Sequence, residues 1–150
     1  MSLSTEIMTA MKEAMKAKDQ NALTSLRAVK SAILLAQTES GAKQELTEEQ
    51  ELKLLQKLVK QRKDSAKIFS DQGRSDLADP ELAQAKVIAK FLPEQMDNDT
   101  IVAIVKEVIS ATGAEGMKDM GKVMGQVNSR VAGKADGGTI ARIVKAALSN

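Results

Sequence analysis

Apolar residues recur at three- and four-residue steps along most of the chain, which is the spacing of one face of an α-helix. No segment alternates apolar and polar residues in the manner of a β-strand. The fold class expected is therefore all-α, with about seven helices. They are predicted over residues 4–18, 21–39, 48–72, 79–91, 98–111, about 117–131 and about 140–148.

Start and stop signals place the ends of several predicted helices. Thr47-Glu48-Glu49-Gln50 is a capping box that opens the longest helix, and Gly73 is expected to end it. The polar stretch 40–44, which contains Gly41, is expected to separate this helix from the one before it. Asp79-Pro80-Glu81 predicts another start, with Asp79 as N-cap and Pro80 in the first turn.

The segment Phe91-Leu92-Pro93-Glu94-Gln95 is the best candidate for a domain boundary, because Pro93 disfavours continuation of a helix. We interpret residues 1–92 as an N-terminal helical bundle and residues 93–150 as a small three-helix domain. The second part contains no aromatic residue. Its hydrophobic core should be small, and we expect this domain to be stabilised by contact with the bundle or with a partner.

Composition excludes much of ordinary enzyme chemistry. The 150 residues include no Cys, His, Trp or Tyr, so thiolate nucleophiles, Ser-His-Asp triads and histidine or cysteine metal sites are ruled out. Aromatic platforms that stack nucleic-acid bases are ruled out as well. We find no set of nucleophile, base and orienting residue, and we expect no catalytic residue, no metal and no cofactor.

Charge and hydropathy bear on the binding partners and the cellular location that can be expected. The chain has 22 basic and 20 acidic residues, a net charge of +2, so any nucleic-acid binding would depend on local clusters. No apolar run approaches the roughly 20 residues that span a bilayer, and no signal-peptide core is found. The expectation from these observations is a cytoplasmic protein without a membrane partner.

The densest basic cluster lies on the longest predicted helix and its end. Between positions 57 and 67 there are five basic residues and one acid, Asp64; the basic residues are Lys57, Lys60, Arg62, Lys63 and Lys67. Along the helix and its end, Lys53, Lys57, Lys60, Lys67 and Arg74 are three, four or seven residues apart. Such spacing predicts one basic face about 30 Å long, enough to follow several phosphates. An ordinary solvated helix face is the alternative interpretation.

Arg62 falls in register with the apolar positions of the same helix. A guanidinium on a buried face needs a carboxylate or helix carbonyls, so we expect a structural pair there.

Glycine-rich segments near the C-terminus are the second candidate interface. Gly121 and Gly125 lie four residues apart in a predicted helix, at a cost of about 2 kcal/mol relative to alanine at both positions. Either a neighbouring helix or an RNA backbone could approach there. Lys134 precedes a predicted helix start that suits a phosphate, although a tight turn capped by Asp136 is the alternative.

Several motifs occur in the order typical of YqeY-like proteins. They are Leu26-Arg27-x-x-Lys30-Ser31-Ala32-Ile33, Lys60-Gln61-Arg62-Lys63-Asp64-Ser65-Ala66, Gly73-Arg74-x-Asp76-Leu77 and the boundary segment 91–95. The segments 120–125 and 133–137 are similar to the tail domain that this family shares with the GatB subunit of a glutamine-dependent tRNA amidotransferase. Where this chain has Gln84 and Lys86, members of the family often have acidic residues.

The resemblance implies a helical bundle followed by a small helical tail that helps to hold tRNA. The kinase and transamidation domains of the amidotransferase have no counterpart here. Carried over by position, Lys122, Gly125, Lys134 and Gly137 become candidate contacts to an RNA backbone, beside the cluster from Lys53 to Arg74. We expect a non-catalytic tRNA-binding or accessory protein, with an aminoacyl-tRNA synthetase or the amidotransferase as possible protein partner. A module that docks on a tRNA enzyme without touching RNA is the first alternative, and an amidotransferase-like enzyme, suggested by the family resemblance alone, is the second.

Overall fold

The structure is a computed structural model that describes residues 2–39, 41 and 44–149. This part of the chain forms seven α-helices and one short 3₁₀ turn, and it contains no strand, so the all-α prediction is confirmed. Of the polar stretch 40–44, residues 40, 42 and 43 lie outside the described residues. The chain divides into two compact units, Met1–Leu92 and Pro93–Asn150.

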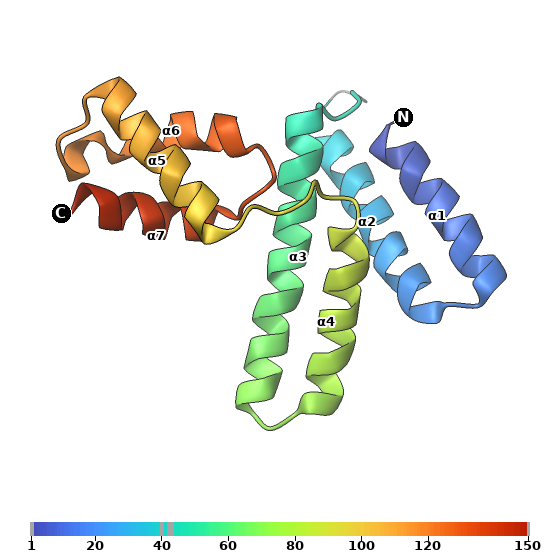
Figure 1. Ribbon diagram of the computed structural model, residues 1–150. Helices are drawn as coiled ribbons and strands as arrows, with labels where there is room; N and C mark the ends of the chain where they lie inside the picture. The colour runs from blue at the N-terminus through green and yellow to red at the C-terminus, as the bar shows by residue number, and fades with distance from the viewer. Residues whose placement is uncertain (1, 40, 42–43, 150) are drawn as a thin grey trace. The chain divides into compact units, whose positions relative to one another are not determined.

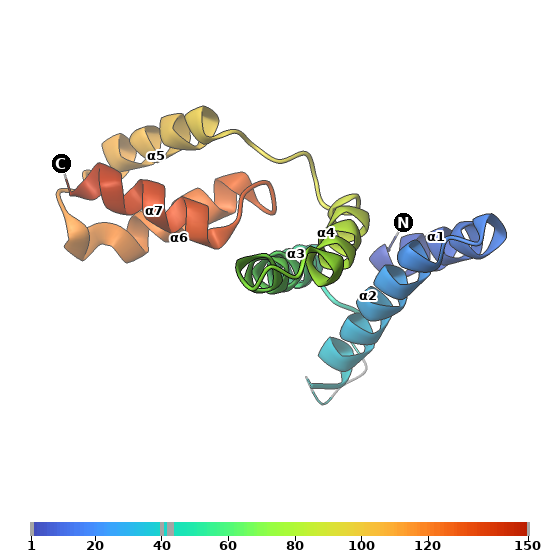
Figure 2. The ribbon, with the colours of Figure 1, turned by 90° about the horizontal axis from the view of Figure 1, so that it is seen from below.

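The first unit consists of two helical hairpins. Helices α1 (Leu3–Ala17) and α2 (Gln20–Glu39) form one, and α3 (Glu48–Asp71) and α4 (Ser75–Ala89) form the other. The partners of each hairpin lie side by side in both views of the ribbon (Figures 1 and 2). Helix α2 also packs against α4, which joins the two hairpins.

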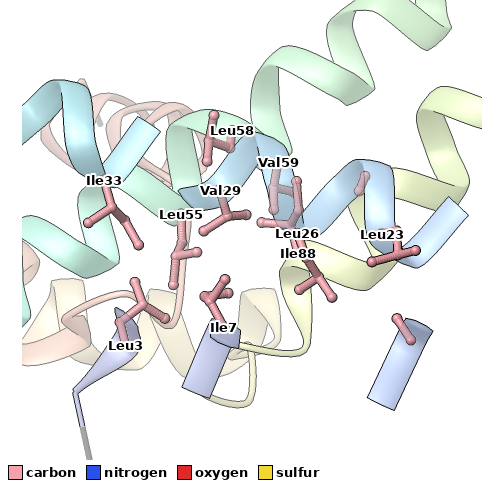
Figure 3. Packing of buried hydrophobic residues seen from close by; sticks show 12 residues of the cluster. Leu3, Ile7, Leu23, Leu26, Val29, Ile33, Leu55, Leu58, Val59 and Ile88 are labelled. Atoms are coloured by element: carbon pink, nitrogen blue, oxygen red, sulfur yellow. The ribbon is translucent and has the colours of Figure 1, made fainter. Parts of the chain in front are cut away.

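All four helices contribute to the core of this unit. Ile7 of α1, Val29 of α2, Leu55 of α3 and Ile88 of α4 are each no more than 1% exposed. Figure 3 shows these side chains converging between the helices. Complete burial of an aliphatic side chain of this size contributes about 1.5–3 kcal/mol, so these contacts hold the two hairpins together.

A carboxylate from α3 meets the start of α1. Glu51 accepts a hydrogen bond from the backbone of Leu3, at the end of α1 where N–H groups lack helical partners. Burial raises the pKa of Glu51, and the hydrogen bond from Leu3 acts against that rise. The contact therefore adds a polar link between the hairpins at the edge of their apolar core.

The ends of α3 are as the sequence predicted. Thr47 Oγ1 accepts from the Gln50 backbone N–H at 3.2 Å, and Gln50 Oε1 accepts from the Thr47 backbone N–H at 2.9 Å. This is the expected capping box. Gly73 follows the C-cap with φ +72°, a conformation that glycine adopts without steric cost.

The predicted start of the fourth helix is wrong. Helix α4 begins at Ser75 rather than after Asp79, and Pro80 lies inside it. Ala78 is 1% exposed, and a helix that began after Asp79 would not place it in this packed position. Pro80 removes the N–H that would bond the Asp76 carbonyl, and its ring crowds the same carbonyl. Because Asp76 is exposed, water can satisfy that carbonyl near the helix end.

Arg62 joins the two helices of the second hairpin. The side chain is half-buried; its Nε donates to Gln84 Oε1 and its Nη1 donates to the Leu58 carbonyl, both at 3.3 Å. The expected structural pairing is therefore present. It uses an amide and a helix carbonyl, and no salt bridge of Arg62 occurs among the described residues.

The second unit has three helices around a core of its own. They are α5 (Asn98–Thr112), α6 (Met120–Val131) and α7 (Gly137–Leu148), with a 3₁₀ turn, η1 (Met117–Asp119), before α6. Each helix buries three aliphatic side chains: Ile101, Val105, Val108, Val123, Val127, Val131, Ile140, Val144 and Leu148. The helix expected over about 117–131 is thus shortened, because Asp119 accepts from the Glu115 backbone N–H and stabilises the preceding turn.

Hydrogen bonds fasten the segment before α5 to the loop between α6 and α7. The Met96 backbone N–H donates to the Lys134 carbonyl at 2.8 Å, and Gln95 Nε2 donates to the Gly133 carbonyl at 3.0 Å. Gln95 Nε2 also bonds the Pro93 carbonyl at 2.8 Å. We call these contacts the 93–96 clip; they close the second unit at its N-terminal end.

Candidate nucleic-acid interface

The lysines of the long helix are largely neutralised by acids one turn away. Lys53 Nζ lies 2.7 Å from Glu49, Lys60 Nζ 2.7 Å from Asp64, and Lys67 Nζ 3.8 Å from Asp71. Both partners of each pair are well exposed, so each pair adds little to folding stability. Their effect is on charge, because each lysine has an anion beside it.

Arg74 does not belong to the same helix face. Helix α3 ends at Asp71, and Arg74 is the N-cap of α4 beyond the Gly73 turn. Its Nε and Nη2 each bond one carboxylate oxygen of Asp76 at 3.0 Å. The guanidinium lowers the pKa of Asp76, and the carboxylate is thereby kept charged.

The α3 stripe is therefore a mixed-charge surface rather than a basic one. We define it as Lys53, Lys57, Lys60 and Lys67 together with the acids Glu49, Asp64 and Asp71 on the same face. Lys57 is the member for which no ion pair occurs among the described residues. Asp64 is the one acid between Lys57 and Lys67, and the structure adds Glu49 and Asp71, from outside that range, as partners of Lys53 and Lys67.

The glycines of α6 face open space. A Cβ atom built on Gly121 or Gly125 would meet nothing within 4 Å. The interpretation that a neighbouring helix packs on these glycines therefore finds no support in the second unit. Lys122 is exposed beside them and has no ion pair among the described residues.

Two polar residues that sequence reasoning missed extend this surface. Asn128 is three residues after Gly125 and Ser129 is four residues after it, so both lie on the same side of α6 and are exposed. We call this set, with Gly121, Lys122 and Gly125, the α6 face. Helical spacing from Gly125 would have identified both residues. The α6 face carries one lysine, one side-chain amide and one hydroxyl group, and it carries no carboxylate.

The start of α7 is already capped by the protein. Asp136 accepts from the Thr139 backbone N–H at 2.9 Å and from the Thr139 hydroxyl at 2.6 Å. The capped turn is thus the interpretation that the structure supports, because a carboxylate stands where a phosphate would bind. Gly137 is exposed at this end, with open space around its Cβ position.

Lys134 is held apart from Lys122. Its backbone N–H bonds the Val131 carbonyl at 2.7 Å and its carbonyl takes part in the 93–96 clip, while its side chain is exposed. Lys122 lies in the first turn of α6 and Lys134 follows its last turn. The intervening helix separates them by about 14 Å, so they can contact an extended ligand but do not form one pocket.

Within the described ranges, no group of three or more acidic side chains is placed to hold a metal ion. No helix in this part of the chain is both long enough and apolar enough to cross a membrane.

Two fungal proteins are similar to most of the chain. The "Altered inheritance of mitochondria protein 41, mitochondrial" of Clavispora lusitaniae is 31% identical over 125 residues, which cover 81% of this chain and 72% of the relative. The protein of the same name from Pyrenophora tritici-repentis is 32% identical over 127 residues, covering 83% of this chain and 68% of the relative.

These names correct the expected location. Both relatives are described as mitochondrial, which points away from the cytoplasmic location that the sequence suggested. That expectation rested on missing features, and missing features do not identify a compartment.

The family assignment rests on nearly the whole length of the chain. Besides the relatives, the family model described as "Yqey-like protein" matches residues 4–148, which include both units. The motifs noted in the sequence lie on α2, on α3, at the start of α4, between α4 and α5, on α6 and in the loop before α7. The chain belongs to the YqeY-like family.

Proposed function

We propose that this protein is a non-catalytic accessory factor that binds tRNA through the α6 face of its second unit. The observation that carries the proposal is the open surface at Gly121 and Gly125, since both glycines weaken α6 and neither is required by packing. A sugar-phosphate backbone can approach glycines closely while Lys122 neutralises a phosphate. The similarity of segments 120–125 and 133–137 to a tRNA-holding tail supports the same choice of ligand.

Recognition in this proposal depends on shape and phosphate. The chain has no Trp or Tyr, and neither of its two Phe residues lies in the second unit. Base stacking is therefore absent from the interface, and affinity should be modest and should fall steeply with salt. Lys134, beyond the other end of α6, would meet a second phosphate group of the same RNA.

The α3 stripe supports a different role. Its paired charges suit contact with another mixed-charge protein surface better than contact with a polyanion. This favours the second candidate, a module that docks on a tRNA enzyme without touching RNA.

Direct binding of the full chain to bulk tRNA and to double-stranded DNA of similar length, at two salt concentrations, tests the first proposal. Lys122→Glu should weaken tRNA binding about tenfold and reduce the salt dependence by about one phosphate contact. Lys106→Glu on α5 is the matched control, because it changes an exposed lysine and the same net charge. Equal losses for both variants, or no tRNA binding at low salt, would overturn the assignment of the α6 face as a tRNA site. The module that docks on a tRNA enzyme would then be the remaining candidate function.

A further inference from the structure

The α1–α2 hairpin has a groove whose floor is formed by residues of its packed core. The groove is shallow and is lined by Ser4, Ile7, Lys30, Ile33, Leu34 and Gln37. Since α1 and α2 run side by side (Figure 1), it follows the line between the two helices. Ile7 and Ile33 form its buried floor.

Exposed apolar side chains continue the groove along α1. Ser4, Met8, Met11 and Met15 are spaced four, three and four residues apart, so they share one side of the helix. Met8 is 49% exposed and Met15 52% exposed, while Leu34 on the facing helix is 53% exposed. Together they form an apolar strip that the first unit leaves uncovered.

The charged side chains that α1 and α2 place beside this strip are basic, whereas Asp19, between the two helices, caps α2 by accepting from the Ala22 backbone N–H. Arg27 and Lys30 lie on the same side of α2 as Leu34, are exposed, and have no ion pair among the described residues. The acids of α1 between its ends, Glu6 and Glu13, lie about 180–200° around the helix from Ser4. The negative charge of Glu6 instead helps to raise the pKa of Glu51 on α3.

Helix α2 adds only one carboxylate, Glu39, at its last residue. We name Met8, Met15, Arg27, Lys30 and Leu34 the α1–α2 face. None of its cations forms an ion pair among the described residues, whereas three of the four lysines of the α3 stripe do, and its cations lie next to exposed apolar groups.

We propose that the α1–α2 face is a docking site for an acidic amphipathic helix of a partner protein. A groove between two antiparallel helices accepts a third helix, whose apolar residues at i, i+3 and i+4 would contact Leu34 and the methionines. Methionine side chains adapt to different apolar partners. Carboxylates flanking the apolar positions of that helix would pair with Arg27 and Lys30.

Position and chemistry favour a protein over a lipid surface. Lys30 lines a concave groove together with Ile33 and Leu34, and a rod-shaped helix fills such a groove more completely than a flat bilayer surface does. A carboxylate of a docked helix would compensate the charge of Lys30. The site lies in the first unit, so it is independent of the tRNA site proposed for α6.

The test uses two fluorescent 16-residue helical peptides with identical leucine positions, one with glutamates and one with lysines at the polar positions. The acidic peptide should bind the full chain and the basic peptide should bind at least tenfold more weakly. With methionine methyl groups labelled by ¹³C, the NMR signals of Met8 and Met15 should shift on binding. Those of Met117 and Met124, in the second unit, should not.

Matched variants locate the site. Leu34→Ser and Lys30→Glu should each weaken binding of the acidic peptide at least fivefold. Leu35→Ser and Lys60→Glu should not, because Leu35 is also exposed on α2 but points about 100° away, and Lys60 lies on α3. Circular dichroism checks that every variant is folded.

Equal binding of both peptides would overturn the proposal, as would unshifted Met8 and Met15 signals. It would also be overturned if these signals shifted on adding phosphatidylglycerol vesicles but not peptide, or on concentrating the protein alone.

Discussion

The α3 stripe and the α6 face show how differently two lysine-containing helices can present charge. The stripe has four lysines, but three have a carboxylate one turn away, and Arg74 beyond it is paired as well. The α6 face has one lysine and no carboxylate, beside glycines that leave the backbone accessible. The difference teaches that the acids at neighbouring helical positions decide whether a basic run attracts a polyanion.

The largest effect is expected when the acids of the stripe are removed. Neutralising Glu49, Asp64 and Asp71 as Glu49→Gln, Asp64→Asn and Asp71→Asn would remove the negative charge that lies beside each of three lysines. The binding of tRNA at low salt should then tighten about tenfold and its salt dependence should steepen by about two phosphate contacts. Titration of bulk tRNA at several salt concentrations measures both quantities.

A control with the same change in net charge separates local from overall effects. Glu13→Gln, Glu39→Gln and Glu94→Gln remove three acids that lie outside α3 and should change tRNA binding much less. If both triple variants gained equally, net charge rather than helical pairing would govern binding, and the contrast between stripe and α6 face would fail.

Glycine substitutions give the next largest effect, with opposite signs at two positions of the second unit. Gly125→Ala should stabilise the unit by about 1 kcal/mol, because α6 gains helix propensity and the new methyl group has space. Gly133→Ala should destabilise it by about 1 kcal/mol, since Gly133 has φ +80°. Urea unfolding followed by circular dichroism measures the two changes.

The same Gly125→Ala variant also tests whether Gly125 is needed for tRNA binding rather than for stability. We expect its tRNA affinity to fall while its stability rises. A variant that is less stable than the parent would show that Gly125 serves packing, contrary to the open space around it.

The smallest effects concern pH and have opposite signs in the two units. Hydrogen bonds from the Thr100 hydroxyl and backbone N–H lower the pKa of Asp97, the N-cap of α5. Its contribution to stability is therefore present above the usual aspartate pKa and is lost as pH falls through the lowered value. Asp97→Asn should flatten the acid side of the stability profile of the second unit.

Glu51 is expected to act in the other direction. Burial raises its pKa, so its contribution is present below the usual glutamate pKa and is lost as pH rises through the raised value. Glu51→Gln should remove this small loss of stability of the first unit with rising pH. Thermal unfolding between pH 3 and pH 7 tests both variants, and identical profiles for variant and parent would contradict the assigned shifts.

Local signals predicted most of the fold. Helical periodicity found the seven helices that the described residues form. The capping box at Thr47 and the left-handed Gly73 were correct because each depends on a few neighbouring residues. The start of α4 was missed because Ala78 is buried within the helix, and its burial outweighs the local signal of Pro80. Tertiary packing of this kind is not visible in a four-residue window.

The candidate interface was less predictable for a related reason. The spacing of Lys53, Lys60 and Lys67 was visible in the sequence, but their pairing depends on side-chain conformations. The open space at Gly125 depends on which helices surround α6. The sequence alone therefore left two interpretations, contact with a neighbouring helix and contact with an RNA backbone. Only the arrangement of the second unit distinguishes a glycine that packs from one that is exposed.

The 93–96 clip fixes where the second unit begins. The amide of Met96 lies before α5, outside any helix, yet its hydrogen bond to Lys134 belongs to the folded unit. Its hydrogen should therefore exchange with deuterium far more slowly than those of ordinary linker amides. A fragment cut immediately before Asp97 would keep all three helices and lose this closure, whereas one that starts at Pro93 would retain it.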